Sequence, residues 1–267
     1  MTEPQAPPVP SRRWMVAVAS VPAAVVGLVI TVVLAVLVGP VGALVGIGIT
    51  AITVLWVWSV SSVDPTPGVL AGLEVRDANR AGEARLVNLV DGLSLTGGVT
   101  TPALHVVETD AINAMVIGLG DGDAHIVVTS GLLGGLDRVE LEAVLARAVV
   151  VIRRGDLGAT TTALQVLHGS KRGGPSWLVR PVAGVIAGRV PAAGPDADVL
   201  LDREAVGLTR YPPGLVGALK RLVGAPLTVA GVTPVTSSLW LADPLPPDPG
   251  RAPRTPIADR IEALELL

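Results

Sequence analysis

The chain has 267 residues, a formal net charge of −3 and no cysteine. An acidic balance argues against a general nucleic-acid binder, and the lack of cysteine excludes disulfides, iron–sulfur clusters, cysteine-ligated zinc and thiol nucleophiles. The length allows one domain of ordinary size together with a further segment.

The first sixty residues predict a helical hairpin. Residues 1–13 are polar and rich in proline, and we expect them to form a disordered cytoplasmic tail. Two uncharged runs follow, Trp14–Val38 and Val41–Val60, separated only by Gly39-Pro40. Each run is long enough to cross the apolar core of a bilayer. The pattern therefore predicts a transmembrane helical hairpin over residues 14–61, with the lipid bilayer as its partner.

Flanking cations predict the orientation of this hairpin. Two arginines precede the first run and three follow the second, whereas the connecting turn has none (Arg12, Arg13, Arg76, Arg80 and Arg85). Because positive residues favour the cytoplasmic side, we expect a multi-pass protein of the inner (plasma) membrane with both termini and the main domain in the cytoplasm. Alternatively, SRRW at Ser11 resembles the start of a twin-arginine export signal, although no convincing cleavage site follows it.

After a linker over residues 62–80, the rest of the chain (81–267) reads as one domain with mixed signals. Apolar spacing predicts a helix over residues 81–95. Short β-type runs at 104–107, 115–117 and 125–129 are separated by Asp, Asn and Gly, which is typical of strands and turns.

A second helix is predicted just after Asp137. Asp137 followed by Glu140 forms a capping-box pattern, the apolar residues recur at helical spacing, and Gly155 ends the run. Positions 147 and 151 are one turn apart and share a face of this helix.

Residues 177–190 are apolar but interrupted by charge, and they are too short for a confident third span. Between Arg147 and Arg189 there are seven Lys or Arg residues against one acid, Asp156. Such a segment fits either contact with an anionic membrane surface or a solvated loop.

With this order of segments, residues 85–267 resemble the HtpX-like membrane zinc metallopeptidases, relatives of the CAAX prenyl proteases. The resemblance rests on DAINAMVIG at Asp110, on AHIVVTSGLLGGLDRVELEAVLA, on DVLLDREAVGLTRYPPGLVGALKRL and on the endings SLWLADPLPP and TPIADRIEAL. It implies an α+β fold, with a mostly helical zincin-like metallopeptidase domain that contains a small β-sheet and follows the transmembrane hairpin.

The catalytic positions of the family are replaced here. The resemblance aligns the first zinc-binding His with Arg147, the general-base Glu with Ala148, the second His with Val151 and the Glu ligand with Asp198. A further family His falls at Arg254. Catalytic zinc needs about three protein ligands, and an arginine cannot become one. Zinc, the cofactor of the family, is therefore not expected, and we expect no metal and no cofactor.

Other candidate sites in the sequence are weak. The three histidines (His105, His125 and His168) lack helical ligand spacing. The Gly-rich run at Gly118 lacks the Lys-Ser/Thr of a phosphate loop. Ser130 has no evident His partner, and the Asp121/Asp123 pair fits a hairpin turn better than a cation site.

Two expectations about the altered site follow. Arg147 could reach Asp198 in an ion pair that replaces zinc as a clasp between two helices; otherwise Arg147 points to solvent and Asp198 caps a helix. The resemblance also places Asn113, Ala114 and Met115 on a strand beside the cleft, and such an edge can pair with an extended peptide, unless the cleft has closed.

These features predict a catalytically inactive family member that acts as a binding or regulatory protein in membrane protein quality control. Its partners would be unfolded or membrane protein segments, or an active paralogue. The alternatives are an active zinc-dependent endopeptidase with an unconventional site, and a structural subunit of a membrane assembly, because Gly42, Gly46 and Gly48 permit close helix packing.

Overall fold

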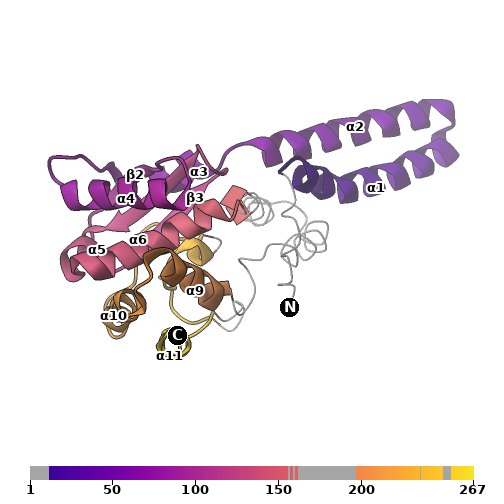
Figure 1. Ribbon diagram of the computed structural model, residues 1–267. Coiled ribbons are helices and arrows are strands. Elements are labelled where there is room, and N and C mark those ends of the chain that lie inside the picture. The colour runs from indigo at the N-terminus through magenta and orange to yellow at the C-terminus, as the bar shows by residue number, and fades with distance from the viewer. Residues whose placement is uncertain (1–11, 156, 159, 162–196, 235, 249–253) are drawn as a thin grey trace. The chain divides into compact units, whose positions relative to one another are not determined.

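The structure, a computed structural model, describes residues 12–155, 157–158, 160–161, 197–234, 236–248 and 254–267 (Figure 1). These residues belong to two compact units, one ending at Pro65 and the other comprising residues 66–161 together with the described residues from Ala197 onward. The segment 177–190 and the predicted tail before Arg12 lie outside the described residues.

The first unit is a pair of helices, α1 (Arg12–Val38) and α2 (Pro40–Ser62), which contact each other along their lengths. They break at Gly39, whose φ of 78° lies in the region that glycine adopts most readily. The next residue, Pro40, occupies the first turn of α2, where its missing N–H costs nothing. The break falls where the sequence predicts it.

Small residues allow α1 and α2 to approach closely. A Cβ atom at Gly46 would lie 2.5 Å from Thr31 Cα, and one at Gly42 would lie 2.1 Å from the carbonyl oxygen of Leu34. The hydroxyl oxygens of Thr31 and Thr50 lie 3.3 Å apart across the hairpin. Gly42 and Gly46 therefore serve packing within the hairpin, whereas a Cβ atom at Gly48 would meet nothing within 4 Å.

The outward side chains of this hairpin are mostly apolar, and many are exposed, among them Val36, Leu37, Leu44, Ile52 and Leu55. Searched over the residues that the structure describes, no helix is both long and apolar enough to cross a membrane. The transmembrane interpretation of residues 14–61 stays a prediction.

The second unit contains a four-stranded mixed sheet in the order β1-β2-β4-β3. The strands are β1 (Arg76–Asp77), β2 (Ala103–Val107), β3 (Ala114–Gly118) and β4 (Ala124–Thr129). β2 runs parallel to β4, and the other two pairs are antiparallel. The three strands predicted from the sequence are confirmed to within one residue at each end.

Part of the predicted linker 62–80 has regular structure. It contains a short helix, α3 (Thr66–Gly72), and β1, which pairs with β2. A two-residue strand is too short to show an alternating pattern, so β1 could not be predicted from periodicity.

Both faces of the sheet are covered. Val106, Ile126 and Val128 pack on one face against α4 (Ala84–Gly97) and α6 (Arg138–Arg153). Met115 and Val127 pack on the other face against α3 and against side chains near the end of the chain, those of Val229, Val232, Leu239 and Trp240. β3, most of β4 and the second half of β2 are therefore buried, which explains their apolar runs, whereas both residues of β1 are exposed.

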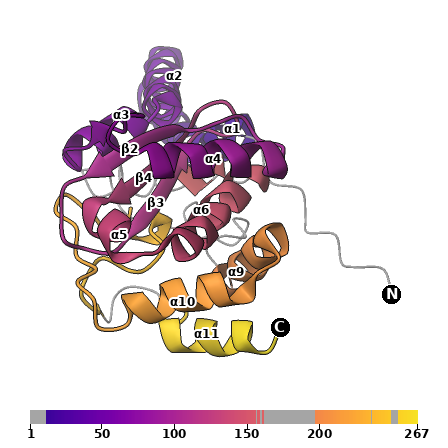
Figure 2. The same ribbon diagram turned by 60° about the vertical axis from the view of Figure 1, so that its left-hand side comes forward.

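The remaining helices are α5 (Ser130–Gly135), α9 (Ala197–Thr209), α10 (Pro212–Leu222), the 3-10 helix η2 (Ser237–Leu239) and α11 (Ile257–Glu265). Figures 1 and 2 show α6 between α4 and the pair α9 and α10, with α11 beside α10. The described part of this unit is mostly helical with a small mixed sheet, as expected for the predicted α+β class.

Candidate functional site

The site is built on α6, whose start is fixed by a capping box. One carboxylate oxygen of Asp137 accepts hydrogen bonds from the amides of Val139 and Glu140 at 2.8 Å each, and the Glu140 carboxylate accepts from the Asp137 amide at 3.0 Å. This confirms the helix start predicted from the sequence. The apolar side of α6 is buried in the core, which fixes the direction of Arg147, Ala148 and Val151.

The structure brings Arg147 and Asp198 together. α9 carries Asp198 and Asp202 one turn apart, and both reach the Arg147 guanidinium on α6. Arg147 Nη2 donates to Asp198 Oδ1 at 2.6 Å, and Arg147 Nε donates to Asp202 Oδ1 at 2.8 Å. One arginine thus links α6 to two successive turns of α9.

Two further arginines from the end of the chain complete the group. Arg254 donates to both carboxylate oxygens of Asp198, at 2.8 and 3.0 Å from Nη2. Arg260 forms a two-point contact with Asp202, with Nε to Oδ2 at 2.7 Å and Nη2 to Oδ1 at 2.9 Å. We call Arg147, Asp198, Asp202, Arg254 and Arg260 the arginine–carboxylate cluster.

The cluster is buried and carries an excess positive charge. Three arginines face two aspartates, which leaves a formal charge of +1 (3 − 2) among these residues. The side chains of Arg260 and Asp202 are 1% and 0% exposed, whereas Arg254 is 19% exposed. Buried charges of this kind persist only when they are paired and hydrogen-bonded, and here each carboxylate meets two guanidinium groups.

The protonation behaviour of Asp198 follows from these neighbours. Burial alone would raise the pKa of its carboxyl, but the charges of Arg147 and Arg254 outweigh burial and hold the pKa below its ordinary value. Burial lowers the pKa of Arg147, although an arginine remains protonated in proteins. Asp198 and Arg147 therefore face each other as an ionised pair at neutral pH.

The residues present do not fit the zinc ion of the related peptidases. Ala148 and Val151 offer no ligand atom, and both oxygens of the remaining carboxylate, Asp198, are engaged by arginines. Over the described part of the chain, no group of three or more His, Cys, Asp or Glu side chains could hold a metal ion. Arg147 stands at the position expected for the first ligand, and its guanidinium has no lone pair to donate to a metal.

The predicted peptide-binding edge is occupied by the chain itself. Asn113, Ala114 and Met115 are buried, and the outer edge of β3 is covered by residues 237–242, which we call the strap. The Leu241 amide donates to the Ala114 carbonyl at 2.7 Å, and Met115 forms an antiparallel bridge with Trp240. In this structure the edge expected to be open beside a cleft is closed.

Asn113 is the residue that joins this edge to the strap. Its Nδ2 donates to the Ala242 carbonyl at 2.9 Å, and its Oδ1 accepts from the Ala242 amide at 3.2 Å. The side chain therefore mimics a neighbouring strand for one residue of the strap. Asn113 belongs to the site through this contact and not through contact with solvent.

The weaker candidates behave as structural residues. Asp121 accepts from the Thr100 amide, and Asp123 accepts from the Leu119 amide in the turn between β3 and β4. Ser130 exchanges hydrogen bonds with the Thr109 backbone. These contacts leave none of the three arranged as a nucleophile or a metal ligand.

Two of the histidines are neighbours on the sheet, and His168 lies outside the described residues. His105 Nε2 lies 2.9 Å from His125 Nδ1, and His105 Nδ1 lies 2.9 Å from the Asp77 carboxylate. Burial and the neighbouring His125 lower the pKa of His105. A hydrogen bond between the two imidazoles therefore links β2 to β4, and the Asp77 carboxylate of β1 lies within ion-pair distance of His105.

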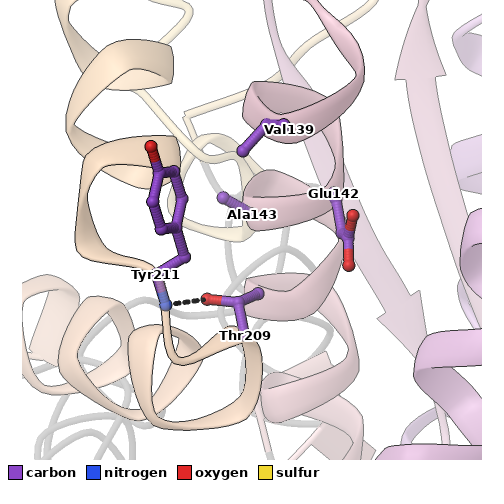
Figure 3. A pocket seen from close by; sticks show the side chains of 5 residues that line it. All are labelled: Val139, Glu142, Ala143, Thr209 and Tyr211. Atoms are coloured by element: carbon purple, nitrogen blue, oxygen red, sulfur yellow. Dashed lines mark hydrogen bonds between the residues drawn. The ribbon is translucent and has the colours of Figure 1, made fainter.

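A separate pocket of about 270 Å³ lies beside the start of α6 and the turn between α9 and α10 (Figure 3). It is lined by Val139, Glu142, Ala143, Thr209 and Tyr211. The Tyr211 amide donates to Thr209 Oγ1 at 3.4 Å. None of these residues belongs to the arginine–carboxylate cluster, and a single carboxylate gives the pocket no catalytic pair.

The chain is similar to several curated proteins that share one name. A protein named Protease HtpX homolog from Dictyoglomus thermophilum is 30% identical over 219 residues, which covers 72% of each chain. Proteins of the same name from Dictyoglomus turgidum and Listeria monocytogenes are 28% and 26% identical over 220 residues, covering 72% and 67% of this chain and 72% of each relative. No family model matches the chain.

Proposed function

Because this chain belongs to the HtpX protease family, we propose that it is a non-catalytic member that binds polypeptide without hydrolysing it. It would act as a binding or regulatory protein in the quality control of membrane proteins.

The observation that carries the proposal is the position of the Arg147 guanidinium. It lies on α6, at the position that the resemblance aligns with the family's first zinc ligand, and it donates to both Asp198 and Asp202. A zinc ion there would face three guanidinium groups instead of neutral imidazoles, with no carboxylate at position 148 to accept a proton from water. What remains of the family's site is the scaffold and the neighbouring strand β3.

We expect purified protein to hold less than about 0.1 equivalent of zinc, since the single carboxylate left at the expected ligand positions, Asp198, is paired with arginines and is far short of the usual three ligands. We also expect no chelator-sensitive cleavage of unfolded casein. Metal analysis and casein digestion in the same detergent preparation test both, with the relative from Dictyoglomus thermophilum as the positive control. Stoichiometric zinc together with cleavage would establish the endopeptidase alternative instead.

The hairpin supports a membrane location as part of this proposal. Its exposed apolar side chains would be unfavourable in water over so large a surface, and the flanking arginines favour cytoplasmic termini. The bilayer is the environment that would cover them.

The orientation is tested with a reporter that is active only in the cytoplasm. Fused after Leu267 it should be active, whereas the same reporter inserted at Gly39 should be inactive. A fusion after Leu267 that is inactive in the cytoplasm and active outside it would contradict the orientation and would support the export alternative based on SRRW.

A further inference from the structure

The strap over the edge of β3 is attached in an unusual way. Only one backbone hydrogen bond, from Leu241 to Ala114, joins it to the strand within the described residues. The Asn113 side chain adds two bonds to Ala242. A regular strand would gain a ladder of such bonds along its whole length, so the β-type pairing of the strap is short.

Two arginines of the arginine–carboxylate cluster also contact the strap. Arg254 Nη1 donates to the Trp240 carbonyl at 2.9 Å and to the Ser237 carbonyl at 3.4 Å. Arg260 Nη1 donates to the Leu241 carbonyl at 2.8 Å. The same two arginines are held by Asp198 and Asp202, so the ion pairs of the cluster also fix the strap to β3.

One side chain of the strap, that of Trp240, fills a deep apolar position but buries a polar N–H group there. Trp240 is 1% exposed and packs with Met115, Ile117 and Val127 on the sheet. Its indole N–H is buried and has no hydrogen-bond partner within the described residues. A buried donor without a partner is unfavourable, so a wholly apolar side chain such as Phe or Leu would suit this position better.

We propose that residues 237–242 are a displaceable internal strand that occupies a peptide-binding edge, held there by Arg254 and Arg260. The partner that replaces it is an extended polypeptide segment with a large apolar side chain at the Trp240 position. This inference rests on the proposed function, that the chain binds polypeptide, and it adds where the polypeptide binds and what controls access.

The alternation of a β-strand defines this partner further. A segment that pairs antiparallel with β3 presents alternate side chains to the sheet face and away from it. Only the residue opposite Met115 enters the apolar position that Trp240 fills. We therefore infer recognition of exposed apolar strands, as in unfolded chains, with hydrogen bonds supplied by backbone and not by particular side chains.

The test uses the full chain in detergent and a fluorescein-labelled peptide of alternating Phe and Thr, with a matched peptide of alternating Glu and Thr as control. Arg254→Gln removes the charge from the partly exposed arginine of the cluster. Arg221→Gln, at an arginine that instead pairs with Glu140, is the matched control variant.

We expect Arg254→Gln to speed amide exchange in residues 237–242 and to tighten binding of the Phe peptide by about tenfold, the effect of removing roughly one hydrogen-bonded contact. Arg221→Gln should change neither measurement. Faster exchange without tighter binding would overturn the inference.

A disulfide separates this inference from the proposed function. The chain has no cysteine, so the pair Ala114→Cys and Leu241→Cys introduces one defined cross-link across an antiparallel contact. We expect the oxidised protein to lose the Phe peptide and dithiothreitol to restore binding. Binding of the Phe peptide by the oxidised protein would refute the inference that the strap must be displaced, but it would leave the proposed polypeptide binding intact. Failure of every form of the protein to bind the peptide would refute both proposals.

Discussion

Replacing Arg147 with alanine should lower the free energy of unfolding by about 3–5 kcal/mol, the range found when one member of a buried ion pair is removed. The Arg147 side chain is 8% exposed, and its loss leaves Asp198 and Asp202 each with one cation instead of two. It also cuts the connection between α6 and α9. Arg203→Ala, at an exposed position on α9, is the control and should cost less than about 0.5 kcal/mol.

Denaturant unfolding of the single and double variants measures the coupling directly. In the cycle of Arg147→Ala and Asp198→Ala we expect a coupling energy of about 1–3 kcal/mol. Recovery in the double variant should be incomplete, because Asp202 still lacks Arg147 and Arg254 lacks Asp198. If the losses in unfolding free energy of the two single variants simply add up in the double variant, the contact between Arg147 and Asp198 does not act as a clasp between the helices.

Acid titration gives an independent check of the same contact. Because the pKa of Asp198 is lowered in the folded protein, its contribution is fully present above the unfolded value, near 4, and is lost as the pH falls through the folded value. Asp198→Asn should therefore flatten the fall in stability below about pH 4. The wild type and the variant should differ little in the slope of stability against pH near neutrality.

Local patterns in the sequence were enough to place the scaffold of this site. The capping box at Asp137 and Glu140 depends on residues three apart, so it could be recognised without tertiary information. The apolar runs of β2, β3 and β4 were visible for the same reason. The ordered motifs of the resemblance then placed Arg147 and Asp198 at matching positions of two helices.

The rest of the cluster could not be predicted in the same way. Asp202 and Arg260 are 58 residues apart in the chain and meet only because α9 and α11 pack together. The resemblance aligns Arg254 with a family His, but its contacts with Asp198 and the strap depend on tertiary packing that no local pattern indicates. A single ion pair was expected, whereas the structure has five charged groups that share partners.

The closed edge of β3 shows a second limit of sequence reasoning. Asn113, Ala114 and Met115 suggest an edge strand, but nothing in their pattern says whether residues from elsewhere in the chain cover that edge. Residues 237–242 have no alternating pattern and form a 3-10 turn followed by a single bridge. Their backbone carbonyls accept hydrogen bonds from Arg254 and Arg260, which fixes their position. Because every residue has a backbone carbonyl, the residue types in this segment do not indicate these contacts.

Restoring the family residues on α6 and α9 alone should fail to restore tight zinc binding. The variant with Arg147→His, Ala148→Glu, Val151→His and Asp198→Glu supplies three ligands and a general base, which would suffice in an open site. In this chain Arg254 donates to both oxygens of residue 198, so we expect it to compete with the metal for that carboxylate. We expect zinc to bind this variant weakly and casein to remain uncut.

Adding Arg254→His should tighten zinc binding by about 100-fold, the upper range of effects from groups that contact metal ligands. The physical reason is charge: Asp202 and Arg260 remain a neutral pair, while the carboxylate at 198 loses its competing cation. Zinc affinity is measured by competition with a chelator, and Arg254→Gln in the same background separates loss of charge from gain of an imidazole. Equal zinc affinity with Arg, Gln and His at position 254 would show that Arg254 does not control this carboxylate. Tight binding with all three, together with casein cleavage, would show that only the α6 and α9 substitutions separate this chain from an active peptidase.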